Sequence, residues 1–111
     1  MTTVYLLGLT DAYAAGVFQG CVSLVTAYLD KMEIIGEYAF QSNSSIETIY
    51  IPSCTNLGGS CGDNNVFAYI IGATITLTVP NSIYTNCGGS GLPDADITVL
   101  QTFNTVTVIG V

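Results

Sequence analysis

The sequence has almost no positive charge. Its 111 residues include one Lys, Lys31, and neither Arg nor His, so the formal net charge is −7. A chain with this balance cannot neutralise a row of phosphates, which excludes nucleic-acid binding, and an anionic membrane surface would repel it. The lack of His removes the commonest general base and the commonest metal ligand. The composition therefore argues against catalysis and favours a binding or structural role.

Long apolar runs are missing as well, although half of the residues are hydrophobic and disorder is thereby excluded. The longest runs, 4–9 and 66–73, are each broken by Gly and fall far short of the ~20 residues that a membrane-spanning helix needs. Residues 12–14 resemble a signal-peptidase site, but no positive residue precedes them and Asp11 is charged. We expect one small domain with no membrane span and no export signal of its own.

The four cysteines show no metal-binding spacing. They lie at positions 21, 54, 61 and 87, which match no zinc pattern, and there is no His to complete a site. Their even number permits up to two disulfides. We expect them to be mostly buried free thiols that pack as small hydrophobic side chains, with Cys54–Cys61 as the best disulfide candidate.

An internal repeat of 22 residues is the strongest pattern in the sequence. Segments 17–24 and 39–46 share Phe, Gln and Ser in register, and each ends in an aliphatic residue. The same offset superposes further pairs on either side, namely Tyr13 and Ile35, Thr26 and Thr48, Tyr28 and Tyr50, and Ile35 and Leu57. A third copy opens at Phe67 and carries an insertion of five residues within 58–65. A period in the low twenties with one short strand per unit is typical of solenoids of the leucine-rich class.

Each unit combines a strand with a turn. Residues 46–51 are rich in β-branched and aromatic side chains, which favour the extended state, and their alternation predicts Ile46, Thr48 and Tyr50 on one face. A Pro follows the strand, at 52 and again at 80, and ends its pairing. Residues 34–40 predict one helical or 3₁₀ turn with Ala39 and Phe40 facing inward.

These residues resemble the BspA-type leucine-rich repeats. The resemblance covers about residues 7–80 and rests on the second unit, Ile35-Gly36-Glu37-Tyr38-Ala39-Phe40 with Ile46, Ile49 and Ile51-Pro52, and on segment 17–24 of the first unit. Cys21 fills the cysteine position of the motif in the first unit, whereas Asn43 stands there in the second. The resemblance implies a curved α/β solenoid, as in bacterial surface adhesins, protist surface proteins and phage-borne proteins, and it brings no catalytic residues.

The last part of the chain departs from the repeat. Residues 86–94 read as a loop, and 97–100 and 105–109 read as a strand or short turn followed by a final strand. We therefore expect a short leucine-rich solenoid of about three units over 1–80, and a β-rich C-terminal cap over 81–111 in the same domain. The N-terminal end enters the apolar repeat at Val4 without a comparable cap. This predicts a homo-oligomer, or docking onto a neighbouring protein, at that end.

The candidate ligand-binding residues are Tyr28 and Tyr50, which recur at the repeat offset and would form an aromatic ladder on the sheet together with Tyr5. Asp94 and Asp96 are weak candidates for calcium because their oxygens are hard donors, but no calcium-loop spacing surrounds them and we expect no cofactor. The scattered acids fit a solvated surface better than a catalytic pair.

Two functions remain open at this point. The chain is either a non-enzymatic protein of surface recognition or adhesion, which binds a glycan or a protein on an extracellular surface or a virion, or a structural subunit that assembles end to end into a fibre.

Overall fold

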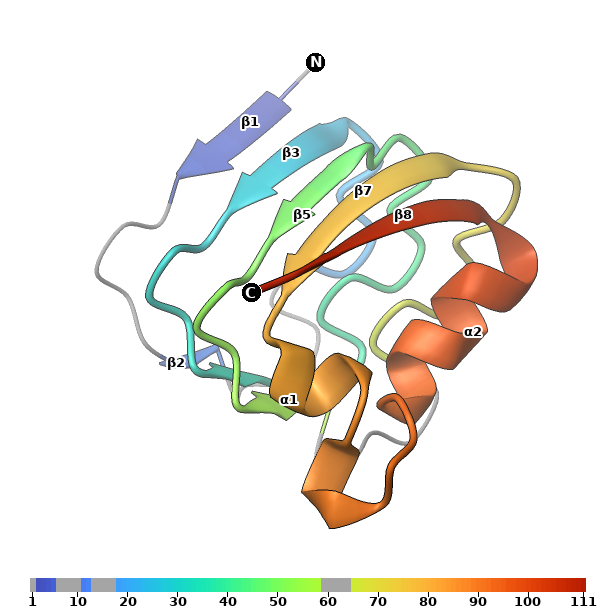
Figure 1. Ribbon diagram of the computed structural model, residues 1–111. Coiled ribbons are helices and arrows are strands. Elements are labelled where there is room, and N and C mark those ends of the chain that lie inside the picture. Colours follow the sequence, from blue (N-terminus) through green and yellow to red (C-terminus); the bar gives the residue numbers. More distant parts are fainter. Residues whose placement is uncertain (1, 6–10, 13–17, 59–64) are drawn as a thin grey trace.

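The strands form two parallel sheets (Figure 1). In the computed structural model the described residues are 2–5, 11–12, 18–58 and 65–111. The larger sheet has the order β1-β3-β5-β7-β8, with the bounds Thr2–Tyr5, Leu24–Tyr28, Thr48–Tyr50, Thr74–Val79 and Thr105–Gly110. The smaller sheet has the order β2-β4-β6, with the bounds Asp11–Ala12, Ile34–Ile35 and Asn56–Leu57. The chain is thus a small α/β domain in which sequential strands of each sheet are parallel neighbours.

The strand register follows the 22-residue offset of the sequence. Thr26 pairs with Thr48 and Tyr28 with Tyr50 in the larger sheet, and Ile35 pairs with Leu57 in the smaller one. These are pairs that the sequence alignment superposes, and the register confirms them. At the next step Thr48 pairs with Thr76, an offset of 28, because the third copy contains extra residues.

The first step of the register differs from the expected one. Between Thr2 and Thr3 the pairing with β3 shifts by one residue, so that Tyr5 lies beside Tyr28, an offset of 23. The same offset recurs in the smaller sheet, where Ala12 is the partner of Ile35. The expected superposition of Tyr13 on Ile35 is therefore wrong by one position; Tyr13 itself lies outside the described residues.

The turns opposite the larger sheet also repeat. The backbone N–H of Phe18 donates to the Ala39 carbonyl at 2.9 Å, and that of Phe40 donates to the Val66 carbonyl at the same distance. Equivalent positions in three successive turns, Gly20, Ser42 and Tyr69, all have φ between 63° and 69°, a left-handed conformation in which a residue other than Gly is strained. The recurrence at non-glycine residues shows that the stacked turns impose this backbone shape.

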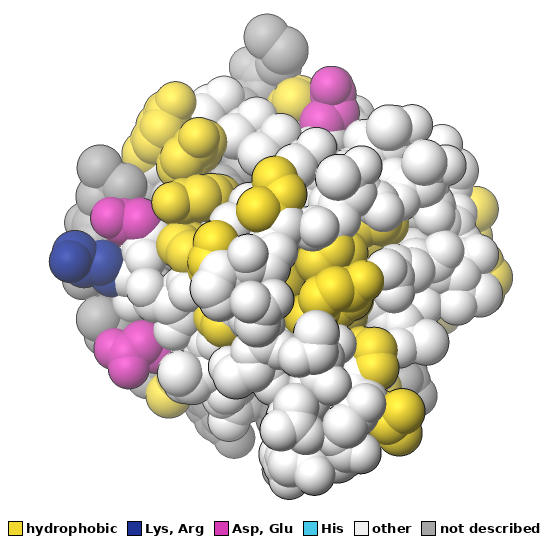
Figure 2. Space-filling model, viewed as in Figure 1, with side chains coloured by type: hydrophobic (Ala, Val, Ile, Leu, Met, Phe, Trp, Pro, Cys, Tyr) yellow, Lys and Arg dark blue, Asp and Glu magenta, His cyan; other side chains and the backbone are white. Residues whose placement is uncertain are grey.

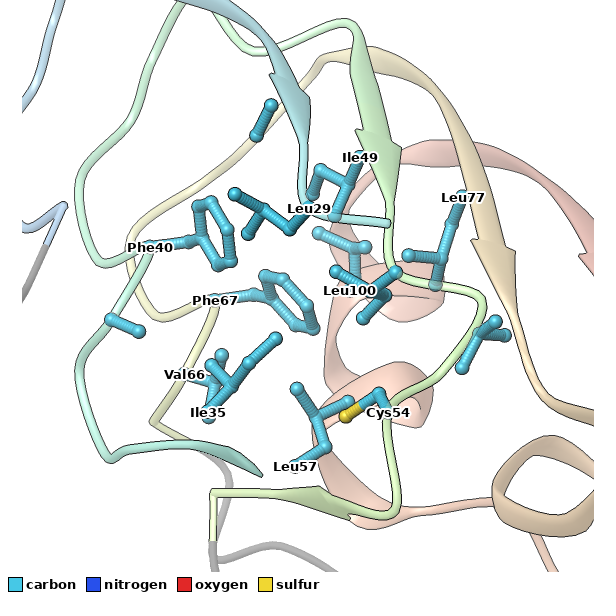
Figure 3. Packing of buried hydrophobic residues seen from close by; sticks show 14 of the residues in the cluster. Leu29, Ile35, Phe40, Ile49, Cys54, Leu57, Val66, Phe67, Leu77 and Leu100 are labelled. Carbon is cyan, nitrogen blue, oxygen red and sulfur yellow. The ribbon is translucent and has the colours of Figure 1, made fainter. Parts of the chain in front are cut away.

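The core lies between the two sheets (Figure 3). A stack of phenylalanines runs through it: the ring centroids of Phe18 and Phe40 are 5.3 Å apart, and those of Phe40 and Phe67 are 5.7 Å apart. Ala39 and Phe40 are fully buried, which confirms that they face inward. Ile49 and Leu77 point into the same core from the strands, and Leu100 lies on the side of α2.

The segment after β7 is mostly helical. It holds α1 (Asn81–Tyr84), the 3₁₀ turn η1 (Cys87–Gly89) and α2 (Ala95–Phe103), which lies beside β8 in Figure 1. The expectation of a strand or short turn over 97–100, in a β-rich cap, is wrong, because Asp94 caps a nine-residue helix that buries Ile97 and Leu100. The final strand is confirmed as β8.

A second local expectation is also corrected. Ile34 and Ile35 form strand β4 and do not belong to a helical turn; only the residues after Gly36 make turns. The cause is the smaller sheet, in which β4 pairs with a strand on each side and gains backbone hydrogen bonds that an isolated helical turn would lack.

Candidate functional site: the outer face of the larger sheet

The outer face of the larger sheet carries a column of five threonines, one from each strand. Because neighbouring strands are about 4.8 Å apart, their side chains form a regular row of hydroxyl groups. The register places them directly opposite one another, as Thr3, Thr26, Thr48, Thr76 and Thr107. This column was not expected from the sequence, although its signal is there: a Thr stands two residues before each repeated Tyr.

A column of tyrosines runs beside the threonines. The ring centroids of Tyr5 and Tyr28 are 5.2 Å apart, and those of Tyr28 and Tyr50 are 4.8 Å apart. On the next two strands the column continues with Thr78 and Ile109. The structure therefore brings the two predicted residues, Tyr28 and Tyr50, into direct contact and stacks Tyr5 on Tyr28, as expected for the ladder.

The stacking decides what these tyrosines present to a ligand. Tyr28 has a ring on each side, so its faces are covered by its neighbours and a ligand meets ring edges and phenol groups. Tyr5 has a ring neighbour only on the side of Tyr28 among the described residues and is 62% exposed. One broad aromatic face is thus offered at the β1 end of the column, and a row of edges is offered along its middle.

Alternation along the strands explains why the columns face outward. Ala27, Ile49 and Leu77 lie between the column positions and are fully buried, whereas Tyr28 and Tyr50 are half-buried. Ile46 does not share the face of Tyr50, contrary to the alternation expected for 46–51. Ile46 is buried, and it precedes β5, which begins only at Thr48, so the alternation of the strand does not extend to it.

A groove of about 500 Å³ lies at the N-terminal ends of β3, β5 and β7. Its polar lining consists of the hydroxyls of Ser23, Ser44, Ser45 and Thr74, and Glu47 is its one charged lining residue. Since Thr74 is two residues before Thr76 on the same strand, the groove adjoins the threonine column. Together they form a surface of hydroxyl groups with a single carboxylate, Glu47, at the groove.

Charge is confined to the margins of this surface. No strand of the larger sheet contains Asp, Glu or Lys. In Figure 2 the hydrophobic side chains spread over the middle and upper left of the visible face, whereas Lys31, the dark blue group, and the acidic groups lie toward the left and upper edges. Such a face suits a ligand that is itself uncharged.

The weak calcium candidates have structural roles. Asp94 and Asp96 are both buried. Oδ1 of Asp94 accepts from the Asp96 backbone N–H at 2.9 Å and caps α2, and Oδ1 of Asp96 accepts from the backbone N–H of Val66 at 3.1 Å. Asp94 thereby fixes the start of α2, and Asp96 ties α2 to the segment that follows β6. Among the described residues, no group of three His, Cys, Asp or Glu side chains could hold a metal ion.

The cysteines separate into different states. Cys87 is disulfide-bonded, whereas Cys21 is an exposed free thiol and Cys54 a buried one. The expected Cys54–Cys61 bond is therefore wrong; Cys61 lies outside the described residues. Burial raises the pKa of the Cys54 thiol to about 12, since the thiolate would lose its water.

The two free thiols should differ sharply in alkylation. At pH 8 we expect iodoacetamide to modify Cys21 of the folded chain and to leave Cys54 intact, because Cys54 is neither accessible nor ionised. Peptide mass spectrometry reads both sites, and a sample unfolded in urea, in which both react, is the control. Equal labelling in the folded chain would contradict this arrangement.

None of the helices within the described ranges is long and apolar enough to cross a membrane. No protein-family model, curated protein or solved structure matches the chain.

Proposed function

We propose that the chain is a non-enzymatic protein of surface recognition or adhesion that binds a glycan on the outer face of its larger sheet. The observation that carries this proposal is the pair of columns, threonine and tyrosine, set in register across the strands. A parallel sheet is ordinarily covered on both faces, so an open face lined by equivalent polar side chains has a use other than packing.

The chemistry of the face favours a glycan. Each Thr and Tyr hydroxyl both donates and accepts a hydrogen bond, as each sugar hydroxyl does, and neither side needs a charge. Tyr5 offers a ring face against which the C–H face of a sugar can pack, and Tyr28 and Tyr50 offer phenol groups along the row. An extended oligosaccharide running across the strands would meet a Thr hydroxyl at every step of about 4.8 Å, and a Tyr beside it on β1, β3 and β5.

The proposed architecture is a short α/β solenoid of BspA-type leucine-rich repeats. It is supported by the 22-residue register of β3 with β5 and of β4 with β6, and by the recurring turn at Gly20, Ser42 and Tyr69. The proposed location, an extracellular surface or a virion, follows from that resemblance and fits a role in adhesion.

Binding to an array of neutral oligosaccharides, followed by titration of the best ligand, tests the proposal. We expect Tyr28→Ala and Tyr50→Ala each to raise the Kd at least about tenfold, which corresponds to about 1.4 kcal/mol. Tyr50→Phe keeps the ring and removes only the hydroxyl, so it should weaken binding by a smaller factor.

Tyr69→Ala is the matched control, because Tyr69 is 73% exposed but lies outside both columns. The proposal fails if no glycan binds, or if the variants in the column bind as tightly as the Tyr69 variant. Binding of a protein that depends on the same tyrosines would contradict the glycan as the ligand but would still support this face as the binding site.

A further inference from the structure

Both edges of the larger sheet lack the features that usually block strand pairing. The edge strands are β1 and β8, and neither has a second strand neighbour within the described part of the chain. Natural edge strands are commonly protected by Pro, or by Lys and other charged side chains. β1 reads TTVY and β8 reads TVTVIG, so neither contains any of these.

The open side of β8 presents backbone groups ready to pair. The backbone N–H of Thr105 donates to the Ala73 carbonyl at 2.9 Å, and that of Val111 donates to the Val79 carbonyl at 3.1 Å. Because backbone groups alternate in direction along a strand, those of Val106 and Val108 point away from β7, to the open side. Although 81–111 was expected to close the fold, β8 leaves an unpaired edge.

The two edges match each other in residue type as well as in direction. If β1 of a second copy lay parallel to β8 in the register seen elsewhere in the sheet, its Thr3 would extend the threonine column beyond Thr107. Its Val4 would likewise extend the inward column Val4, Ala27, Ile49, Leu77 and Val108. Every inward-facing side chain of β1 would therefore lie beside an inward-facing one of β8, and every outward-facing one beside an outward-facing one. A one-residue slip of the register would destroy this match.

The ends also carry complementary apolar surface. Beside β1 lies a hollow of about 310 Å³ lined chiefly by Val4, Phe18, Val22 and Leu24. At the β8 end, Phe103, Ile109 and Val111 are all about half exposed. An apolar side chain from one end would be removed from water by the hollow at the other.

From these matches we infer that copies of this chain associate head to tail, with β8 of one copy pairing in parallel with β1 of the next. This interaction goes beyond the proposed glycan recognition and does not depend on it. The contact is heterologous, so it produces an open filament, or a ring if the rotation closes. The threonine row and the Tyr28 and Tyr50 phenol groups would recur along the assembly, whereas the open ring face of Tyr5 would be covered by Ile109 of the neighbouring copy at each contact and would stay free only at the β1 end.

Sedimentation velocity over a range of concentrations tests the inference. The weight-average mass of the wild-type chain should rise at least twofold above 11.6 kDa as the concentration increases. Thr3→Lys combined with Thr107→Lys should keep the chain monomeric, because the contact would bring two ammonium groups together. Both threonines are exposed, so folding should not suffer.

Thr3→Glu combined with Thr107→Lys provides the register-specific control. It places opposite charges side by side at the same contact, so association should return and should weaken with added salt. The inference is overturned if the wild-type chain remains monomeric, or if the Lys/Lys and Glu/Lys variants associate equally. A wild-type monomer that binds a glycan through Tyr50 would refute this assembly alone, and a filament that binds no glycan would refute only the recognition role.

Discussion

Phe40→Ala is expected to lower the free energy of unfolding by about 3–5 kcal/mol, the usual cost of truncating a fully buried Phe. Phe40 is fully buried, and its ring is stacked between those of Phe18 and Phe67. The substitution removes the middle of the column that joins three successive turns. Since small domains are stable by only about 5–15 kcal/mol, such a loss is a large share of the folding free energy. Urea unfolding followed by circular dichroism measures the change.

Phe103→Ala is the matched control for this experiment. Phe103 is 53% exposed, so the same substitution should change the free energy of unfolding by only about 0.5 kcal/mol. Equal losses from the two variants would show that the Phe column does not hold the turns together.

Asp96→Ala is expected to cost about 1–3 kcal/mol, because it leaves a buried backbone donor without its acceptor. Oδ1 of Asp96 receives the Val66 N–H at 3.1 Å, and this bond joins α2 to the segment that follows β6. Thermal unfolding followed by circular dichroism gives the change. A Cβ atom added at Gly58 would lie only 2.6 Å from Oδ2 of Asp96. Gly58→Ala should therefore also destabilise the chain.

Asp96→Asn separates the hydrogen bond from the charge. The Asn side chain keeps an oxygen in the same place and can still accept from Val66, so its cost should be clearly smaller than that of Ala. If Asn and Ala destabilise equally, then the negative charge, and not the bond to Val66, is what α2 requires.

The sequence predicted the repeat better than it predicted the ends. The pairs Tyr28 with Tyr50 and Ile35 with Leu57 were visible because equivalent positions in neighbouring parallel strands carry similar side chains. The offset of 23 between Tyr5 and Tyr28 could not be predicted in this way. It arises from a shift in the strand pairing between Thr2 and Thr3, and no residue type in the sequence marks such a backbone irregularity.

Helix α2 shows the limit of local patterns. Ile97-Thr98-Val99-Leu100 is rich in β-branched residues and reads as extended, but burial of Ile97 and Leu100 and the cap at Asp94 outweigh a propensity that spans only about 1 kcal/mol. The pairing state of the cysteines likewise depends on tertiary distances that spacing in the sequence does not contain.

At the candidate site, the two tyrosines were predicted and the threonines were not. Thr is so common in strands that a single one carries no signal, and its meaning appears only when the register sets Thr26, Thr48 and Thr76 opposite one another. The mutual stacking of the tyrosines, which replaces exposed ring faces by edges and phenol groups, likewise follows from the geometry of the parallel ladder.

The most direct test of the proposed recognition face is an NMR titration of the ¹⁵N-labelled chain with the oligosaccharide that binds best on the array. A glycan-binding face at this position predicts that the largest amide shift changes fall on residues 26–28 of β3 and 48–50 of β5, and on Thr76 beside them. Changes concentrated on β4, β6 or α2, with the amides of β3 and β5 unmoved, would contradict it.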